Sequence, residues 1–582
     1  MSVIQDAIDE LNAEQLRAFG VDGDCVVVAP PGSGKTRLLV TRMASDLDRV
    51  EAPRGVACIT LTNSAALEIH DRFDQLSSDS RSNLFIGTVH AFALTRIVRP
   101  FAVAVGQPAL ATAGIASARQ TSELWKLALD DANIRSDAQS LLWTTVRRYR
   151  NAMATEEEWN GLGRDPIAAR DAYFARLEEA NLLDFGRIVE HAASMVENQA
   201  PVRKALRATF KRIYVDEYQD LAPALDRIIR ALCFHPSEEG ALVFAVGDAD
   251  QAIYGWTGTD SRLLRELAAL PSVTAIPLTI NYRNGEHILA LSRRLFPEAG
   301  VVATASRSGG TVIAERIQGG IVGQAAFAAR SITDLADQGA PFHEIAVLGS
   351  TNAIAVEVAT QLELDGTPAW VKINEEWETP LTIGIERLAT WVGHGRDSSG
   401  FKINTLAAEL RRMVPGVNDA FSGRLIASAL GARPDSAAVE LVDDVLSLLT
   451  AGRNAQDVDA LHEEVSAFMT ELRSGSLAGL SVAELGARRV FGERVHVTTL
   501  SSSKGLEFDH VFIVGLEDGR IPFFTSFDSP KEMEEERNKF YVAMTRARKS
   551  VTLLWSGYTV DKYNRRRENP VSRFVRDLGK LS

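Results

Sequence analysis

Short apolar runs alternate with helical patterns at both ends of this chain. Such runs, when helices separate them, are typical of parallel sheets whose two faces are covered. The pattern therefore predicts an α/β fold with strands in both the N-terminal and the C-terminal parts. The clearest strand-like runs are Cys25–Ala29, Val56–Leu61, Leu84–Gly87, Ile213–Val215, Leu242–Val246, Ile345–Leu348, Val495–Thr499, Val511–Val514 and Val551–Trp555.

Two long stretches break this alternation. Between about 104 and 203, apolar residues recur every three or four positions, as in Leu124, Leu127 and Ala128 or Leu141, Leu142 and Val146. Between about 379 and 489 the helical spacing returns, interrupted by glycine and serine at Ser398–Gly400 and Ser474–Gly479. We expect both stretches to be helical insertions into two α/β domains.

Composition restricts the class of protein. The 582 residues are 46% hydrophobic and 24% charged, as in ordinary globular proteins. No apolar window is long enough to predict a membrane span, and the acidic start at Met1–Glu14 does not resemble a signal peptide. The widely spaced Cys25, Cys58 and Cys233 predict buried, inert thiols in a reducing cytoplasm.

The net charge of −13 argues against general attraction to nucleic acid, but it does not decide what one cleft binds. The last segment, Asp561–Ser582, carries seven Lys or Arg and three Asp or Glu. It is either a solvated basic terminus or a DNA-facing segment.

A phosphate-binding loop is predicted at Ala29–Thr36, between a strand-like run and an apolar helix start. Gly32 and Gly34 would let backbone N–H groups turn toward phosphate oxygens, with Ser33 between them. Lys35 would reach the β- and γ-phosphates of ATP, and Thr36 would ligate Mg²⁺. The general pattern has glycine where this chain has Ala29.

Adjacent carboxylates follow another apolar run at Val215–Asp220. Asp216 suits a Mg²⁺ ligand, and Glu217 suits the group that orients the attacking water. By itself such a pair also fits a solvated turn. It lies 181 residues after Lys35, and the first helical insertion explains this separation.

Further candidates follow later apolar runs. Gln251 is a plausible sensor of the γ-phosphate or of water. Tyr254 and Trp256 flank Gly255 and would offer rings for base stacking, although a lone Trp is more often a core residue. Arg283 and Arg546 would bring positive charge from the second domain onto the γ-phosphate.

These motifs together resemble the superfamily 1A helicases of the UvrD/Rep/PcrA type. The similar segments stand in the family's order from residue 11 to residue 574. They are Leu11–Gln15, Gly32–Thr36, Ile59–Ala66, Gly87–His90, Asp216–Asp220, Gly247–Gly258, Asn281–Arg283, Thr499–Phe508, Glu534–Arg548 and Ser572–Phe574.

The resemblance implies two RecA-like P-loop NTPase domains, each a parallel sheet with flanking helices and a helical insertion. Domain 1A would comprise residues 1–103 and 204–276, with insertion 1B at 104–203. Domain 2A would comprise 277–378 and 490–582, with a short insertion 2B at 379–489. Because no residue follows 582, a fused nuclease domain is not expected.

The resemblance also implies roles for single residues. Gln15 would contact adenine, with Arg37 and Tyr282 against its faces, and Glu507 would contact the ribose. Asp216 would hold Mg²⁺, Glu217 would be the general base, and Arg283 and Arg546 would clamp the γ-phosphate. Gln251 would couple that site to DNA. The single-strand path would be lined by Asn63, Thr88, Tyr254 and Trp256.

Four positions depart from the family pattern. Leu61 stands where an aromatic residue is usual, Ser64 where Lys is usual, Thr257 where Arg is usual and Ser501 where His is usual. In the family, all four positions face the DNA or lie on the route that couples the DNA to the nucleotide site, and none of them faces the phosphates. We therefore expect ATP hydrolysis to be better preserved than unwinding, because one lost stacking ring weakens strand binding by roughly 1–3 kcal/mol.

Two functions remain open. The first is a 3′→5′ translocase or helicase on single-stranded DNA or tailed duplex. The second is a nucleotide-gated DNA sensor that regulates a separate nuclease partner and unwinds little. A further resemblance, to the helicase subunit of Gabija anti-phage systems, is carried by Ile86–Thr88, Arg99–Phe101, Thr379–Leu381 and the short second insertion. The alternative is a stand-alone repair helicase.

Overall fold

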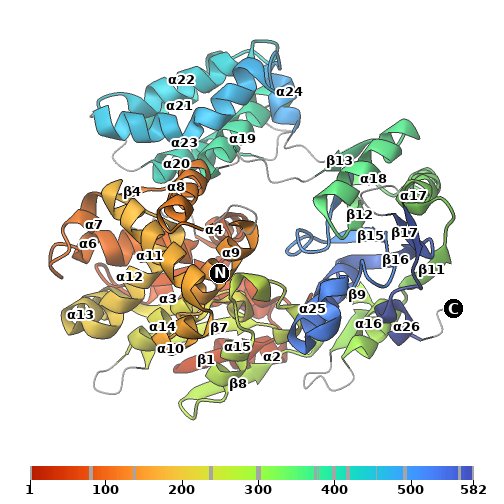
Figure 1. Ribbon diagram of the computed structural model, residues 1–582, viewed down its shortest axis with the longest axis horizontal. Helices are drawn as coiled ribbons and strands as arrows, with labels where there is room; N and C mark the ends of the chain where they lie inside the picture. The colour runs from red at the N-terminus through yellow and green to blue at the C-terminus, as the bar shows by residue number, and fades with distance from the viewer. Residues whose placement is uncertain are drawn as a thin grey trace. The chain divides into compact units, whose positions relative to one another are not determined.

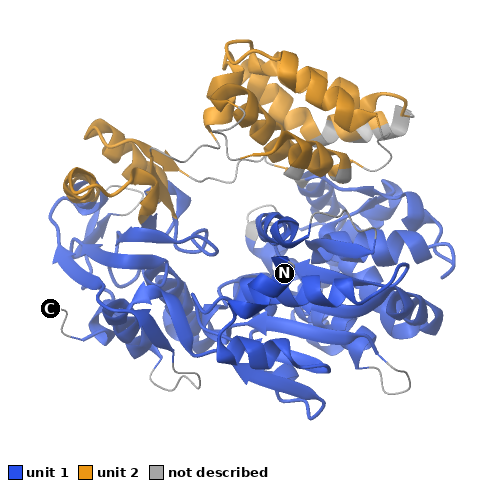
Figure 2. Ribbon diagram, turned by 180° about the vertical axis from the view of Figure 1, so that it is seen from behind, with its two compact units in different colours: residues 1–324, 348–354, 499–582 blue, residues 325–347, 355–498 orange. Residues whose placement is uncertain are grey.

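The chain forms two compact units in a computed structural model (Figure 2). Unit 1 comprises Met1–Gln324, Leu348–Ile354 and Thr499–Ser582, and unit 2 comprises Ala325–Val347 and Ala355–Thr498. The structure describes residues 3–77, 83–134, 139–234, 240–296, 303–371, 377, 379–395, 401–414, 420–453, 455–488, 494–560 and 565–579.

A six-stranded parallel sheet forms the base of unit 1, in the order β3-β2-β6-β7-β1-β8 (Figure 1). Successive residues of a strand face opposite sides of the sheet. Val26 accordingly joins one core cluster while Cys25 and Val27 join the other. The strands are β1 Asp24–Val28, β2 Gly55–Thr60, β3 Leu84–Thr88, β6 Phe210–Val215, β7 Leu242–Gly247 and β8 Val273–Pro277.

Helices cover both faces of this sheet. Leu38 and Leu39 of α3 pack on the same side as Cys25, whereas Ile228 of α14 packs on the side of Val26. The helices nearest the strand ends are α2 Ala13–Phe19, α3 Lys35–Asp48, α4 Asn63–Leu76, α5 Val89–Phe92, α14 Pro223–Cys233 and α15 Arg262–Ala268. The carboxyl ends of β1, β6 and β7 are neighbours, which is where ligands bind in such sheets.

The strands of a second sheet are divided between the units. In unit 1, β11 Thr311–Arg316, β16 Ala547–Trp555 and β15 Phe508–Ile513 are parallel neighbours. In unit 2, β13 Ala369–Val371 pairs in parallel with β14 Val495–Thr499. The strand β12 Ile345–Gly349 begins in unit 2 and ends in unit 1. The prediction of two parallel α/β sheets is confirmed.

All nine predicted runs are strands, with ends displaced by at most a few residues. The sequence analysis did not list β8, β11 or β13. It also missed β9 Ile280–Gly285 and β10 Thr304–Arg307, which form a parallel pair of their own, and the antiparallel hairpin of β17 Tyr558–Val560 with β18 Arg566–Glu568.

The first inserted stretch is helical and has its own core of Trp125, Val146, Trp159 and Tyr173. It also contains a small parallel pair, β4 Gly114–Ile115 with β5 Leu182–Leu183, which the apolar spacing did not predict. Its helices are α7 Ala109–Thr112, α8 Ala118–Asp131, α9 Gln139–Asn151, α10 Glu156–Gly161, α11 Arg164–Glu179, α12 Phe185–Asn198 and α13 Ala200–Thr209.

The second inserted stretch lies in unit 2 and is also helical, around a separate core that includes Leu388, Leu441 and Phe468. The predicted break at Ser398–Gly400 lies outside the described residues. The six domain ranges proposed from the sequence remain predictions. The helices are α19 Pro380–His394, α20 Ile403–Met413, α21 Phe421–Gly431, α22 Ala438–Thr450, α23 Ala455–Ser474 and α24 Val482–Ala487.

Two expectations from composition are met within the described residues. Cys25, Cys58 and Cys233 are free and buried. No helix in the described ranges is long and apolar enough to cross a membrane.

A buried ion network fixes α9 to α12 in the first insertion. Arg150 donates to both oxygens of Asp184 at 2.7 and 2.9 Å and to Glu190 at 2.8 Å. Only 3% of the Arg150 side chain is exposed. We predict that Arg150→Met destabilises the insertion by about 3–5 kcal/mol, because it leaves the buried Asp184 without its cation, although Glu190 keeps its ion pair with Arg187. Hydrogen exchange of α9, α11 and α12 measures this loss.

The matched control is Arg176→Met, which removes the exposed pair with Asp131 in the same insertion. Exchange in that variant should equal that of the wild type. Unchanged protection of α12 in Arg150→Met would contradict the expectation.

Candidate nucleotide and DNA site

The phosphate loop joins the end of β1 to the start of α3. Gly32 and Gly34 have φ values of +68° and +81°. A Cβ on Gly32 would lie 2.5 Å from the Arg283 Cβ, and one on Gly34 would lie 2.7 Å from the Gln15 Nε2. Both positions therefore need glycine for conformation and for space.

The N-terminus of α3 has no side-chain cap at Gly34. The first N–H groups of a helix then remain available, and the helix dipole favours an anion there. Lys35, which is buried, donates to the Ala29 carbonyl at 3.0 Å, and the Ser33 hydroxyl donates to the Pro30 carbonyl at 2.7 Å. Thr36 stands half-buried in the first turn of the helix. This cradle fits a phosphate chain.

The predicted acids follow β6 directly. Glu217 has a φ of +53°, an uncommon conformation for a residue with a side chain, and its N–H donates to Asp216 Oδ1 at 3.1 Å. Gln219 donates to the Glu217 carboxylate and accepts the Asp248 N–H at 2.9 Å. The ends of β6 and β7 are thus tied together beside the acids.

The two neighbouring acids differ in their electrostatics. Burial raises the pKa of Asp216, and the charge of Glu217 raises it further. Burial alone would also raise the pKa of Glu217, but Lys504 and Lys35 outweigh it and hold that pKa below its usual range. Glu217 is therefore ionised and can accept a proton, whereas a cation at Asp216 would favour its charged form.

Lys504 is a central residue to which the sequence analysis gave no role. Its amine donates to the Asp220 carboxylate and to the Gln251 carbonyl, the latter at 2.9 Å, and lies 3.7 Å from the Glu217 Oε2. It also lies 5.6 Å from the ring centre of Tyr254. Its position in the family-like segment Thr499–Phe508 could have marked Lys504 as a functional residue. Its contacts with Asp220 and Glu217 are seen only in the folded chain.

Gln251 is buried just after the end of β7, the strand that lies next to β1 and its phosphate loop. Its side-chain amide donates to the Asp248 Oδ2 at 2.7 Å. Because Lys504 binds its carbonyl, Gln251 connects the acids after β6 with the loop that carries Tyr254.

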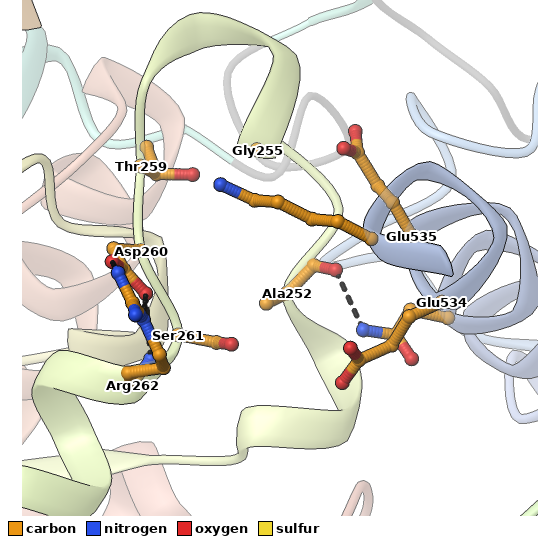
Figure 3. Close-up of a pocket in the computed structure, with 10 residues that line it drawn as sticks. Ala252, Gly255, Thr259, Asp260, Ser261, Arg262, Glu534 and Glu535 are labelled. Carbon is orange, nitrogen blue, oxygen red and sulfur yellow. Dashed lines mark hydrogen bonds and ion pairs between the residues drawn. The ribbon is translucent and has the colours of Figure 1, made fainter. Parts of the chain in front are cut away.

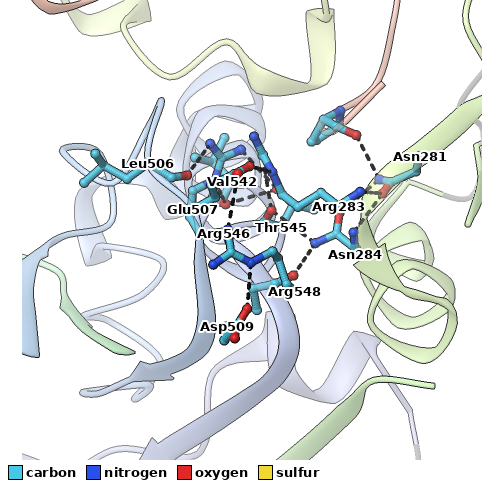
Figure 4. A network of polar contacts seen from close by, with 12 residues as sticks. Asn281, Arg283, Asn284, Leu506, Glu507, Asp509, Val542, Thr545, Arg546 and Arg548 are labelled. Atoms are coloured by element: carbon cyan, nitrogen blue, oxygen red, sulfur yellow. Dashed lines mark hydrogen bonds and ion pairs between the residues drawn. The ribbon is translucent and has the colours of Figure 1, made fainter. Parts of the chain in front are cut away.

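Arg283 belongs to a polar network between β9 and the C-terminal part of unit 1 (Figure 4). Its Nε lies 2.7 Å from the Glu507 Oε2, and Arg548 lies 3.3 Å from the other Glu507 oxygen. Asn284 donates to the Thr545 and Ala547 carbonyls at 3.1 and 2.6 Å. The network places β9 against the residues that surround Arg546.

Arg546 is almost fully buried, and its guanidinium donates to the Val542 and Leu506 carbonyls at 2.9 and 3.2 Å. Burial and the nearby charge of Arg283 lower its pKa to about 9. Among the described residues, the hydrogen bonds of Arg546 go to these carbonyls and to the Thr545 hydroxyl at 3.5 Å, and none of them goes to a carboxylate. An anion such as a phosphate would complement Arg546 and Arg283.

The residues predicted to contact the nucleoside lie around the same loop. Gln15 donates to the Ser33 carbonyl at 3.0 Å, and Asn12 donates to the Tyr282 hydroxyl at 2.7 Å. The ring of Tyr282 is exposed, and Arg37 on α3 forms an ion pair with Glu10. The structure therefore brings Gln15 and Tyr282 to the phosphate loop.

The predicted DNA residues lie beyond the strand ends. Trp256 is 52% exposed, so it is not a core residue, and Arg147 of α9 lies 5.6 Å from its ring. Asn63 is exposed at the start of α4. Thr88 is the last residue of β3 and caps α5, because its hydroxyl accepts the Ala91 N–H at 3.2 Å. Because β2 and β3 are neighbours, Asn63 and Thr88 follow adjacent strand ends.

Comparison with known proteins agrees with this geometry. Residues 11–270 match the UvrD/REP helicase N-terminal domain, and residues 408–558 match the UvrD-like helicase C-terminal domain. The chain is 26% identical to ATP-dependent DNA helicase UvrD1 of Mycobacterium tuberculosis, with 98% of this chain and 85% of that protein covered.

Two further relatives cover most of the chain. It is 28% identical to ATP-dependent DNA helicase UvrD2 of Mycobacterium tuberculosis over 92% of its length and 77% of the relative. It is 26% identical to DNA helicase II of Escherichia coli, over 98% of this chain and 88% of the relative. The chain belongs to the UvrD-type superfamily 1A helicases and is a DNA-dependent ATPase of the ATP-dependent DNA helicase class.

Proposed function

We propose that this helicase hydrolyses Mg-ATP at the carboxyl ends of β1, β6 and β7 and thereby moves 3′→5′ along single-stranded DNA. The observation that supports this most directly is the placement of Glu217 beside the buried Asp216 at the end of β6, with the Lys504 amine 3.7 Å from the Glu217 Oε2. Lys504, Lys35 and Arg546 lower the pKa of Glu217. An ionised base next to cations suits the attack of water on a phosphate.

The phosphates would lie on the loop of Gly32, Ser33 and Gly34, against Lys35 and the uncapped start of α3. Thr36 and Asp216 would hold the magnesium ion, which would neutralise charge on the phosphate oxygens. Glu217 would take the proton of the attacking water.

The remaining residues of the nucleotide site act on either side of the reacting phosphate. Arg283 and Arg546 would meet the charge that develops on the transferred phosphoryl group. Gln251 would couple that group to the DNA path. Gln15, Arg37, Tyr282 and Glu507 would hold the nucleoside.

Single-stranded DNA, alone or as the tail of a duplex, would pass Asn63, Thr88, Tyr254 and Trp256. The exposed ring of Trp256 supports stacking, because a base gains contact area without displacing a packed neighbour. The 3′→5′ direction rests on the family resemblance. The family resemblance supports a cytoplasmic role in DNA repair, and the resemblance to Gabija systems supports a role in anti-phage defence.

A second candidate is a nucleotide-gated DNA-sensing ATPase that regulates a separate nuclease partner and unwinds little. The Thr257 hydroxyl donates to the Tyr254 carbonyl at 2.6 Å, and so it is engaged within its own loop. Ser64 is exposed and uncharged where the family usually has Lys. Fewer strong DNA contacts would favour sensing over strand separation.

The Lys35→Ala variant tests the nucleotide site. We expect ATP turnover with poly-dT to fall by about 10²- to 10³-fold, the usual effect of losing one group that stabilises transition-state charge. Steady-state phosphate release measures the rate. Lys204→Ala, a change at an exposed lysine of α13, should retain wild-type turnover. Full activity of Lys35→Ala would refute the proposed site.

The Trp256→Ala variant tests the DNA path. Loss of a stacking ring should weaken binding of oligo-dT by about 1–3 kcal/mol, or roughly 5- to 150-fold. Fluorescence anisotropy at several salt concentrations measures this. The salt dependence should keep its slope, because no charge is removed. Wild-type affinity in this variant would place the strand elsewhere.

A tailed duplex distinguishes the two candidate functions. A 3′→5′ helicase should displace a strand from a duplex with a 3′ single-stranded tail and leave a 5′-tailed duplex intact. Strand separation in a gel measures the product. ATP turnover that oligo-dT stimulates, with no displacement from either substrate, would favour the sensor. Displacement from the 5′-tailed duplex alone would contradict the polarity.

A further inference from the structure

Helix α25, Pro530–Met544, leads directly to Arg546. Its residues Glu535, Asn538 and Val542 are spaced by three and four positions, so they share one face of the helix. The Val542 carbonyl accepts a hydrogen bond from Arg546. From Glu535 to Met544 the helix spans about 14 Å at 1.5 Å per residue. One face of a single rigid element thus extends from Arg546 toward the loop after β7.

Two polar contacts join this face to the loop that carries Trp256. The Asn538 Nδ2 donates to the Ala252 carbonyl at 2.9 Å (Figure 3). Burial raises the pKa of the Glu535 carboxyl, and the backbone N–H of Trp256, which lies near this carboxylate, lowers it. A Cβ on Gly255 would lie only 2.8 Å from the Glu535 Oε2, so Gly255 permits this close approach.

The space beside these contacts is open. A cavity of about 260 Å³ lies between the loop and α25, lined by Ala252, Gly255, Asp260, Lys531, Glu534 and Asn538 among others (Figure 3). Close-packed interiors contain few voids larger than a water molecule. On the side of this cavity, the loop approaches α25 through the Asn538 hydrogen bond and the close contact of Glu535 with Gly255, whereas its other side is bound to Asn151 of α9 through the Thr257 carbonyl.

We propose that Glu535 and Asn538 are positioning residues that transmit the state of the nucleotide site to Trp256 through α25. This inference rests on the proposed function, in which Arg546 meets the γ-phosphate and Trp256 stacks on DNA. A shift of Arg546 toward a bound nucleotide moves α25, and the two polar contacts carry the Trp256 loop with it. Neither residue is among those proposed to contact the nucleotide.

The test measures coupling between the two ligands. Affinity of the full chain for oligo-dT is measured with and without a non-hydrolysable ATP analogue and Mg²⁺, and affinity for the analogue is measured with and without oligo-dT. By linkage the two affinity ratios must agree, and coupled sites usually show ratios of about 5- to 150-fold. In Glu535→Ala both ratios should fall below about twofold.

Two variants separate positioning from general damage. Glu535→Gln keeps an oxygen near the Trp256 N–H and should restore most of the wild-type ratio. Glu532→Gln removes the same charge from an exposed position of α25 and should leave the ratio unchanged. Asn538→Ala removes the other contact and should lower the ratio as well, which gives a second test if Glu535→Ala does not fold.

The outcomes are distinct. Wild-type ratios in the Glu535→Ala and Asn538→Ala variants would overturn the inference and leave the proposed function intact. Weaker binding of both ligands with an unchanged ratio would also overturn it, because it indicates structural damage alone. If the oligo-dT affinity of the wild-type protein is the same with and without the ATP analogue, the coupling on which both proposals depend is refuted.

Discussion

Charge balance around the carboxylates at the end of β6 constrains the rest of the site. Asp216 and Asp220 are buried, and a buried carboxylate without a cation costs several kcal/mol. Lys35 from the phosphate loop and Lys504 from the segment after β14 supply the opposite charge. Parts of the chain that lie hundreds of residues apart must therefore meet at this point.

This balance explains how a nucleotide can rearrange the site. Lys504 binds Asp220 and lies near Glu217, while Arg546 donates to the Val542 and Leu506 carbonyls and to the Thr545 hydroxyl. In the proposed site, a triphosphate would add negative charge beside Lys35, Arg283 and Arg546. The charge balance among these cations and the acids would then change, which is how the proposed hydrolysis would act on conformation.

The sequence predicted the local features well and the distant contacts poorly. Strand ends and the phosphate loop follow from short patterns, so β1, β6 and β7 and their acids could be located. The strand β8 was missed because its residues are half-exposed or exposed and give no continuous apolar run. Lys504 and Asp220 are 284 residues apart, and no local spacing indicates that they bond. The contact of α25 with the Trp256 loop could not be predicted either, because Asn538 and Ala252 are 286 residues apart.

In the proposed function, the departures from the family pattern at DNA-side positions would weaken DNA binding more than they would weaken the coupling between ATP and DNA. Thr257 replaces the usual Arg, but its carbonyl accepts the Asn151 Nδ2 at 2.6 Å from α9, and its neighbour Gly258 lies close to the Arg148 backbone. On its other side the loop bonds to α25 through its backbone. Because backbone contacts hold the loop, the side chain at 257 does not determine the position of Trp256. In the proposed function, a lost DNA contact at this position would weaken strand separation without breaking the connection to ATP turnover.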